Sequence, residues 1–267
     1  MPVKQSFLLG TLIAAILGCA SFTAWAAGLP ERAKLAVGVS RIVPPYVAGA
    51  KYRTSESIEI ILAKDLAARL KVPLTTLRAT PANRMQLLAS GKADVVLAAI
   101  SDTDPFLRNA AVVPTAYSAA PLAILRTDTD IKQPEQLKGR TVCLSEGGAY
   151  VGTMAASYGA IEKVTKAPAD SLLALRSGVC DAAVHDDTML NELLKLPEWK
   201  KFSARLKVGQ RTTLVLIAPA GDADMLAFLK KTARAWSENS YWLQIRKKWA
   251  SDVAFEVYLD QNVPDCH

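Results

Sequence analysis

The sequence predicts an α/β protein with two open sheets, because short apolar strands alternate with amphipathic helices in two successive sets. About 240 residues of mature chain can form one large or two smaller domains with adequate cores. The stretch GVCDAAVHDD, residues 178–187, places polar residues at both ends of a strand-like run. Ligands of open α/β sheets bind at the carboxyl ends of the strands, so this stretch is a candidate binding wall.

The N-terminus predicts an exported protein. Lys4 precedes an apolar run over residues 7–17, and small residues follow up to Ala26. This pattern is typical of a cleavable secretory signal over residues 1–26, and the run is too short to span a bilayer. Lipoprotein processing at Cys19 is the alternative, although Leu17 fits that pattern poorly. Both alternatives lead to export, with the periplasm as the expected location.

The first set of elements begins shortly after this signal. Apolar periodicity predicts three strands separated by two helices, which is the order of a parallel α/β layer. Ser57 is placed to cap the first helix, and Gly91 to end the second. The elements in chain order are a strand at 34–39, a helix at 57–70, a strand at 73–79, a helix at 82–91 and a strand at 93–100.

The second set repeats this order after Tyr117. Asp187 is placed to cap one of its helices. Trp236, Trp242 and Trp249 have a spacing that favours core packing over a stacking platform for a sugar or base. The predicted strands are 121–126, 141–145, 162–167, 180–185 and 209–219, and the predicted helices are 151–158, 170–178, 187–196, 224–237 and 241–249.

Charge, cysteine and histidine content exclude several function classes. The net charge is +7, but the basic residues are scattered rather than clustered as on a nucleic-acid surface. No C-x-x-C, H-E-x-x-H or G-x-S-x-G motif is present, so we expect no metal site, no cofactor and no catalytic residues. Cys143 and Cys180 lie in strand-like runs that neighbouring strands can bring together, which leaves Cys266 unpaired.

Several segments, in their order and spacing, resemble the periplasmic solute-binding proteins of polar amino-acid ABC transporters (family 3 extracellular solute-binding proteins). These segments are VSRIVPPYV, NRMQLLASGKADVVLAAIS, LKGRTVCLSEGG, SGVCDAAVHDD and LAFLKKTARAWSENSYWLQIRKKW. The resemblance implies the two-lobed type II periplasmic-binding-protein fold, with the ligand between lobes joined by a two-strand hinge. It places residues 27–118 plus 213–267 in lobe I and 119–212 in lobe II, with crossings near 117–120 and 208–213.

The resemblance also implies binding residues in both lobes, namely Tyr46, Ser101, Thr103, Arg108, Gly147, Gly148 and Asp186. Arg108 would hold the carboxylate of an amino acid through its guanidinium fork. The two glycines would offer backbone N–H groups near a helix N-terminus, and Asp186 would take the ammonium group. The family pattern also supports a disulfide between Cys143 and Cys180.

The chain departs from the family pattern at two positions. Arg108 follows Thr103 by five residues where the family has three, and Gly148 stands where the family commonly has Thr or Ser. Arg84 is a competing cation, but its helical context favours a surface position. For Glu146 and Tyr150, the sequence favours neither a position in the cleft nor one that faces solvent.

His185 is expected to be a packing or supporting residue, and Asp181 a structural one. The function predicted from these features is capture of a polar amino acid or related carboxylate by a monomer that delivers it to the permease subunits of an ABC transporter. Two alternatives stay open. One is a periplasmic enzyme on the same fold, similar to dehydratases of prephenate-like acids. The other is an accessory binding protein that feeds a sensor or an oxidoreductase.

Overall fold

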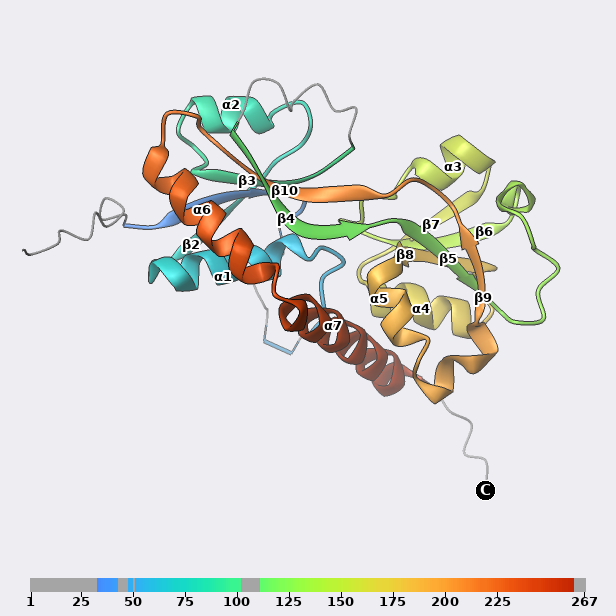
Figure 1. Cartoon of the computed structure of the whole chain (residues 1–267). Coiled ribbons are helices and arrows are strands. Elements are labelled where there is room, and N and C mark those ends of the chain that lie inside the picture. The colour runs from blue at the N-terminus through green and yellow to red at the C-terminus, as the bar shows by residue number, and fades with distance from the viewer. Residues whose placement is uncertain (1–32, 43–47, 50, 102–110, 262–267) are drawn as a thin grey trace, which may run out of the picture.

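The computed structural model describes residues 33–42, 48–49, 51–101 and 111–261. Within them, two five-stranded sheets with flanking helices form two lobes, with β4 and β10 running from one toward the other (Figure 1). The predicted signal, Cys19 and Cys266 lie outside the described residues. None of the helices in the described part of the chain combines the length and apolar character needed to cross a membrane.

The first sheet has the strand order β2-β1-β3-β10-β4. β1 pairs in parallel with β2 and β3, as the sequence predicted, while β10 is antiparallel to both β3 and β4. Every residue of β1 is buried, which explains its continuous apolar sequence. The elements of this lobe are β1 (Leu35–Val39), α1 (Glu59–Leu70), β2 (Leu74–Arg78), α2 (Arg84–Ala89), β3 (Val95–Ile100), β4 (Ala111–Ala119), β10 (Thr212–Ala218) and α6 (Ala223–Trp236).

The second sheet has the order β7-β6-β8-β5-β9. β6 is parallel to β7 and β8, and β5 is antiparallel to β8 and β9. The elements are β5 (Pro121–Leu125), η2 (Pro134–Leu137), β6 (Thr141–Ser145), α3 (Thr153–Tyr158), β7 (Ile161–Thr165), α4 (Pro168–Arg176), β8 (Ala182–Asp186), α5 (Asp187–Leu193), η3 (Pro197–Phe202) and β9 (Ala204–Lys207).

The chain crosses between the sheets twice. β4 ends at Ala119 and β5 begins at Pro121, and the segment 208–211 leads from β9 back to β10. Asp187 joins both crossings, since its carboxylate accepts from the backbone N–H of Ala120 at 3.0 Å and pairs with Arg211. The expectation that Asp187 caps its helix is wrong. It is the first residue of α5, and its side chain is engaged by the hinge.

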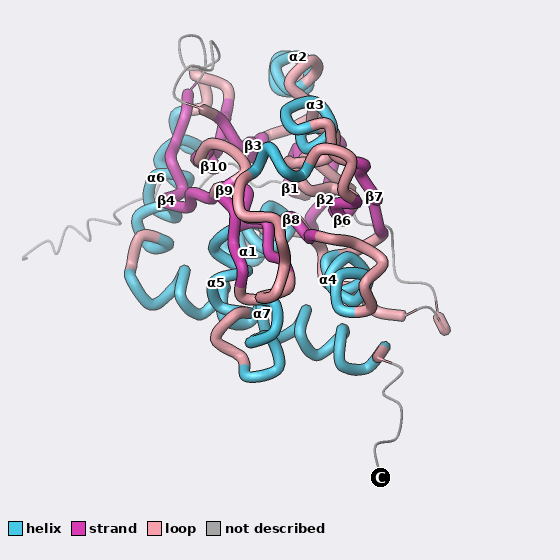
Figure 2. The backbone as a smooth tube through the Cα atoms, turned by 90° about the vertical axis from the view of Figure 1, so that its right-hand side faces the viewer, coloured by secondary structure: helices cyan, strands magenta, loops and turns pink. Residues whose placement is uncertain are grey.

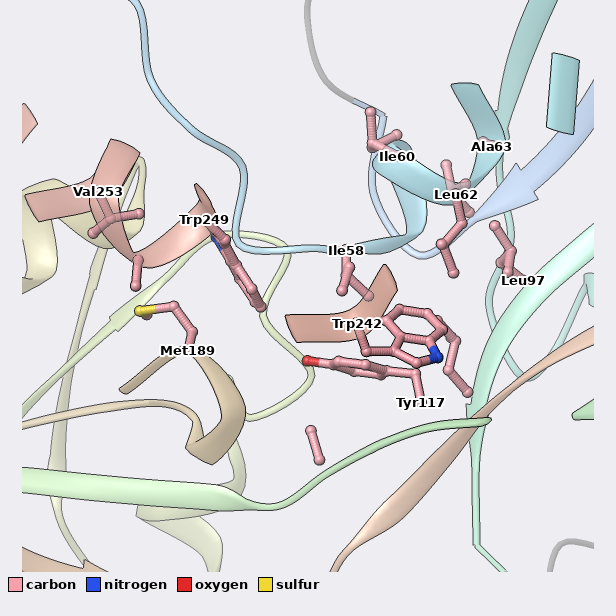
Figure 3. Close-up of a cluster of buried hydrophobic side chains, with 14 of the residues drawn as sticks. Ile58, Ile60, Leu62, Ala63, Leu97, Tyr117, Met189, Trp242, Trp249 and Val253 are labelled. Carbon is pink, nitrogen blue, oxygen red and sulfur yellow. The ribbon is translucent and has the colours of Figure 1, made fainter. Parts of the chain in front are cut away.

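The last helix, α7 (Asn239–Asp260), packs against α4 and α5 of the second lobe (Figure 2). The family resemblance places residues 213–267 in lobe I, and this partition stays a prediction. α7 contacts α6 as well as the helices of the second lobe. Trp242, near the start of α7, packs against Tyr117. Trp249 and Val253, further along the helix, lie toward Met189 (Figure 3).

The core prediction for the three tryptophans is confirmed. Trp236, Trp242 and Trp249 are all buried, with 0%, 7% and 2% of their surface exposed. The rings of Trp236 and Trp242 pack edge to face at 6.3 Å between centroids, a favourable arrangement for aromatic pairs. These side chains therefore join α6 and α7 rather than forming a stacking platform on the surface.

Cys143 in β6 and Cys180 just before β8 form a disulfide, with Cα atoms 5.8 Å apart. Both cysteines are buried. β6 and β8 are parallel neighbours, and Cys143 pairs with Ala183 in the register. The cross-link therefore closes a loop whose ends the sheet already holds together.

We predict that replacing both cysteines with alanine lowers the stability of the protein. The cross-linked residues are 37 positions apart, and a loop of this length is worth about 3–4 kcal/mol in chain entropy. Thermal unfolding of the double variant and of the oxidised wild type measures the effect. The double variant should melt several degrees lower, and equal melting temperatures would contradict the prediction.

Candidate functional site

A cavity of about 350 Å³ lies between the two sheets. One wall comes from the first lobe, where the segment before α1 and parts of β3, β4 and β10 meet. The other wall comes from the turn after β6 and the end of β8. Its charged and phenolic lining residues are Glu56, Glu59, Arg84, Tyr117, Tyr150 and Asp186. The cavity therefore lies at the carboxyl ends of strands, as in other open α/β sheets.

Asp186 lies at the end of β8 and is held by two tyrosines. Its Oδ2 accepts from the hydroxyl of Tyr117 at 2.8 Å, and its Oδ1 accepts from the hydroxyl of Tyr150 at 2.5 Å. Burial raises the pKa of Asp186 to about 6, with the negative charge of Glu56 adding to the increase and the two hydroxyl donors opposing it. Burial also raises the pKa of both tyrosines, so they remain protonated donors.

An irregularity in β4 accompanies the placement of Tyr117 in the cavity wall. Thr213 pairs with Ser118 and Val215 with Pro114, so the register of β4 shifts opposite Leu214. Ala116 adopts a φ of 64°, which is uncommon for a residue with a Cβ. The hydroxyl of Thr115 donates to the carbonyl of Leu214 at 2.7 Å and satisfies a group at the irregularity.

Glu56 connects the two lobes. It precedes α1, yet its Oε2 accepts from the Ser145 hydroxyl and lies 2.7 Å from His185 Nδ1, both in the second lobe. His185 Nε2 lies 3.0 Å from the hydroxyl of Ser171. All four side chains are buried. The expected supporting role of His185 agrees with these contacts, since it touches Glu56 rather than the cavity.

The hydrogen-bonded side chains of Ser171, His185 and Glu56 are connected in the order of a serine-hydrolase triad. The serine, however, does not lie where the nucleophile of such a triad must lie. Ser171 is fully buried and does not line the cavity. A nucleophile must lie next to the reacting carbonyl. The three residues therefore form a structural hydrogen-bond chain.

Two further charged residues line the first-lobe side of the cavity. Glu59 accepts from the backbone N–H of Ser40 at 2.6 Å, and burial raises its pKa to about 7. Arg84 is 6% exposed and faces the same cavity. The expectation of a surface position for Arg84 is wrong, because α2 is a short helix that starts at this residue beside the cavity.

Gly147 and Gly148 lie in the turn after β6, where they meet side chains of the first lobe. Gly147 has a φ of 82°, and a Cβ there would lie 2.2 Å from the Arg41 side chain. A Cβ on Gly148 would lie 3.1 Å from Cγ of Glu56. The backbone N–H of Gly148 donates to the Ser145 carbonyl at 3.1 Å. Both glycines line the cavity, and a role of their backbone in holding a ligand stays a prediction.

The N-terminus of α3, which follows this turn, already holds an anion. The carboxylate of Glu162 accepts from the backbone N–H groups of Gly152, Met154 and Ala155 at 2.7, 2.9 and 3.0 Å. These are the donors that a helix start would otherwise offer to an anionic ligand. The protein's own carboxylate occupies these donors.

The remaining predicted positions divide into three groups. Tyr46, Thr103 and Arg108 lie outside the described residues. Ser101 follows β3, is exposed and is not among the described residues that line the cavity. Tyr150, which the sequence left open, lines the cavity and is buried.

Four other acidic side chains also have defined positions. Glu146, also left open by the sequence, pairs with Arg41 across the lobes at 2.5 Å. Asp181 accepts from the backbone N–H of Thr141 at 2.8 Å, which agrees with its expected structural role. Glu56 and Glu59 were not predicted. In the part of the chain that the structure describes, no group of three His, Cys, Asp or Glu side chains could hold a metal ion.

Solved structures with this fold include an arginine-binding protein variant from T. maritima, at 23% identity and a TM-score of 0.54. That match covers 82% of this chain and 96% of the other. A second is the substrate-binding protein of an amino acid ABC transporter, at 21% identity and 0.52, covering 82% and 99%. A third is the ancestral amino-acid-binding protein AncCDT-1, a precursor of cyclohexadienyl dehydratase, at 21% and 0.52, covering 81% and 95%.

These likenesses show the two-lobed type II fold that the sequence predicted. No curated protein is similar enough in sequence to count as a relative. The model of the bacterial extracellular solute-binding proteins, family 3, matches residues 35–252, which include both sheets and the cavity between them. The chain belongs to the bacterial extracellular solute-binding proteins of family 3.

Proposed function

We propose that this protein captures a polar amino acid in its interlobe cavity, binds the ammonium group at Asp186, and delivers the solute to an ABC transporter. The observation that carries the proposal is the Asp186 carboxylate, fixed by Tyr117 and Tyr150 at the cavity wall. A cavity of about 350 Å³ lies within the usual range for small-molecule sites. Membership of a solute-binding family supports capture as the activity.

The two tyrosines prepare the carboxylate for a cation. Each Asp186 oxygen accepts one hydroxyl and retains a second acceptor position. The carboxylate is thus oriented before a ligand arrives, which reduces the ordering cost of binding. A desolvated ammonium group would then receive a charge-assisted hydrogen bond from a fixed partner.

Contacts between the lobes support closure around the solute. Arg41 pairs with Glu146, and Arg53 pairs with Asp170 at 3.0 Å; each pair joins a residue of the segment before α1 to one of the second lobe. A ligand touching both walls favours the closed state by the difference between its contacts in the open and closed forms.

The carboxylate of an amino acid requires a cation. Arg84 lines the cavity and can offer a bidentate guanidinium, and Arg108 is the family-based candidate outside the described residues. An amino acid is the solute class that would use both an aspartate and an arginine. We propose binding without chemistry, because the one triad-like chain in the described residues ends at Ser171, which does not line the cavity.

Export to the periplasm as a monomer and docking to permease subunits belong to the same proposal. The signal-like N-terminus and the family support export. A co-purification with the permease would separate transport from delivery to a sensor. The protein should then be retained by the permease only when its ligand is present.

We predict that Asp186→Asn weakens binding of amino acids by about 30-fold or more, because truncating a buried charge partner typically costs about 2–5 kcal/mol. Calorimetry with ligands found in a thermal-shift screen measures the change. A ligand at 100 times its Kd should stabilise the wild type by about 2.7 kcal/mol in that screen. Asp128→Asn, on an exposed loop pair with Arg126, is the matched control and should bind like wild type. Unchanged affinity in Asp186→Asn would remove this residue from the site.

Binding should also depend on pH. Asp186, with a pKa of about 6, and Glu59, with a pKa of about 7, are both raised above their ordinary values. Their neutral forms therefore stabilise the ligand-free protein at low pH, and this contribution is lost as pH rises through 6 to 7. The groups facing Asp186 are Tyr117, Tyr150, Glu56 and Asp187.

We predict that the ligand-induced rise in melting temperature grows between pH 5 and pH 8. Asp186 becomes anionic over this range, and the ammonium group of a ligand adds a cationic partner to its two tyrosine donors. In Asp186→Asn, the rise should change less with pH. A rise that is equal at both pH values in the wild type would contradict the assigned role.

A pair of substitutions distinguishes the two arginines. Arg84→Lys and Arg108→Lys keep the positive charge but lose the bidentate fork. Substitution of the arginine that holds the carboxylate should lower the affinity for amino acids at least about tenfold, or about 1.4 kcal/mol. The variant at the other arginine should bind like wild type. Amines without a carboxylate provide the control, since neither variant should change their affinity. If both variants bind amino acids like wild type, the carboxylate contact is wrong.

A further inference from the structure

Glu56 brings a second carboxylate to the cavity. It is 5% exposed and lines the cavity, and its Oε2 is used by Ser145 and His185. Its Oε1 is buried and has no hydrogen-bond partner in the described part of the chain. A buried charged acceptor without a donor is costly, and native proteins rarely retain one without a function. Oε1 therefore marks a place where a ligand donor fits.

Gly148 provides the space that Glu56 occupies. A Cβ at this position would lie 3.1 Å from Cγ of Glu56 and 3.1 Å from the carbonyl of Ser145. Either approach is tighter than ordinary van der Waals contact. A hydroxyl-bearing residue here would push Glu56 away from Ser145, so the glycine and the carboxylate belong to one arrangement.

The charges of the described residues that line the cavity are unbalanced. Its described lining residues include Glu56, Glu59 and Asp186 on the acidic side, with Arg84 as the one cation among them. An amino acid with a single ammonium group would pair one acid at Asp186 and bring a carboxylate of its own. It would leave the Glu56 oxygen without a donor in a site that excludes water.

We propose that the solute carries a second cationic nitrogen group, which binds Oε1 of Glu56 while the first binds Asp186. This inference rests on the proposed function and names its substrate class, a solute with two separated cations. Because Glu56 comes from the first lobe and Asp186 from the second, such a solute bridges the lobes with a charge pair at each end. Glu56 acts both as a lobe contact, through Oε2, and as a ligand contact, through Oε1.

The test uses pairs of probes that match in size but differ by one cation. L-lysine and L-2-aminoheptanoate differ in the terminal ammonium, and cadaverine and n-hexylamine repeat the comparison without a carboxylate. Calorimetry on the wild type should show L-lysine binding at least about tenfold tighter than L-2-aminoheptanoate. In Glu56→Gln, the two affinities should fall within about threefold of each other.

Ser145→Ala is the matched control, because it removes a lobe contact of Glu56 and leaves the carboxylate charge in place. It should keep the preference for L-lysine. Asp186→Asn should weaken all four probes. Retained binding of L-2-aminoheptanoate by Glu56→Gln also shows that this variant folds.

Three outcomes overturn the inference. If the wild type binds L-2-aminoheptanoate as tightly as L-lysine, no second cation is recognised, while the proposed binding at Asp186 survives. If Glu56→Gln loses both probes equally, Glu56 is a lobe contact alone. If no amine binds and a dicarboxylic acid does, the proposed function fails together with the inference.

Discussion

Two adjacent aspartates at the end of β8 connect the cavity to the hinge. Asp186 accepts from Tyr117, which β4 carries from the first sheet, and Asp187 holds the backbone of Ala120 together with Arg211. One strand end therefore fixes both chain crossings and one wall of the cavity. Any rotation of the second lobe must move these contacts together, so the position of the Asp186 carboxylate and the geometry of the hinge are coupled through a single dipeptide.

Periodicity alone predicts most of the fold, because each buried strand and amphipathic helix has a local sequence pattern. Periodicity does not predict β4 and β9, because these two strands lack such a pattern. β4 contains Pro114 and a register shift, and its alternating burial is not matched by its sequence, because Thr115 is buried and Ala116 is exposed. β9 has only four residues, among them Arg205 and Lys207, and its pairing with β5 depends on tertiary context.

The site was less predictable than the fold, for a physical reason. Asp186 follows a strand, so its place at a sheet edge can be inferred from sequence. Arg84 and Glu56 flank helices, where charged residues ordinarily face solvent or the helix dipole. Their burial results from the meeting of two lobes that are distant in sequence. Glu162 shows the same limit, since no local pattern reveals that it fills the N-terminus of α3.

If the two lobes close around a solute, as we propose, the carboxylates of the cavity favour a cationic one. Glu56 and Glu59 are buried and Asp186 is partly buried, and burial raises the pKa of Glu59 and Asp186 because their charged forms are destabilised. Burying a charged carboxylate costs free energy, and the interlobe contacts of Glu56 offset part of this cost through Oε2 alone. A cationic solute would offset the rest of this burial cost in the closed form. In the open form the two walls are apart, so the solute would pair with fewer of the carboxylates. That difference in interaction free energy is what a ligand needs in order to shift an equilibrium between two lobe positions. The acidic cavity thus favours coupling closure to the arrival of positive charge, whereas an uncharged solute of equal size would leave the buried carboxylates unpaired.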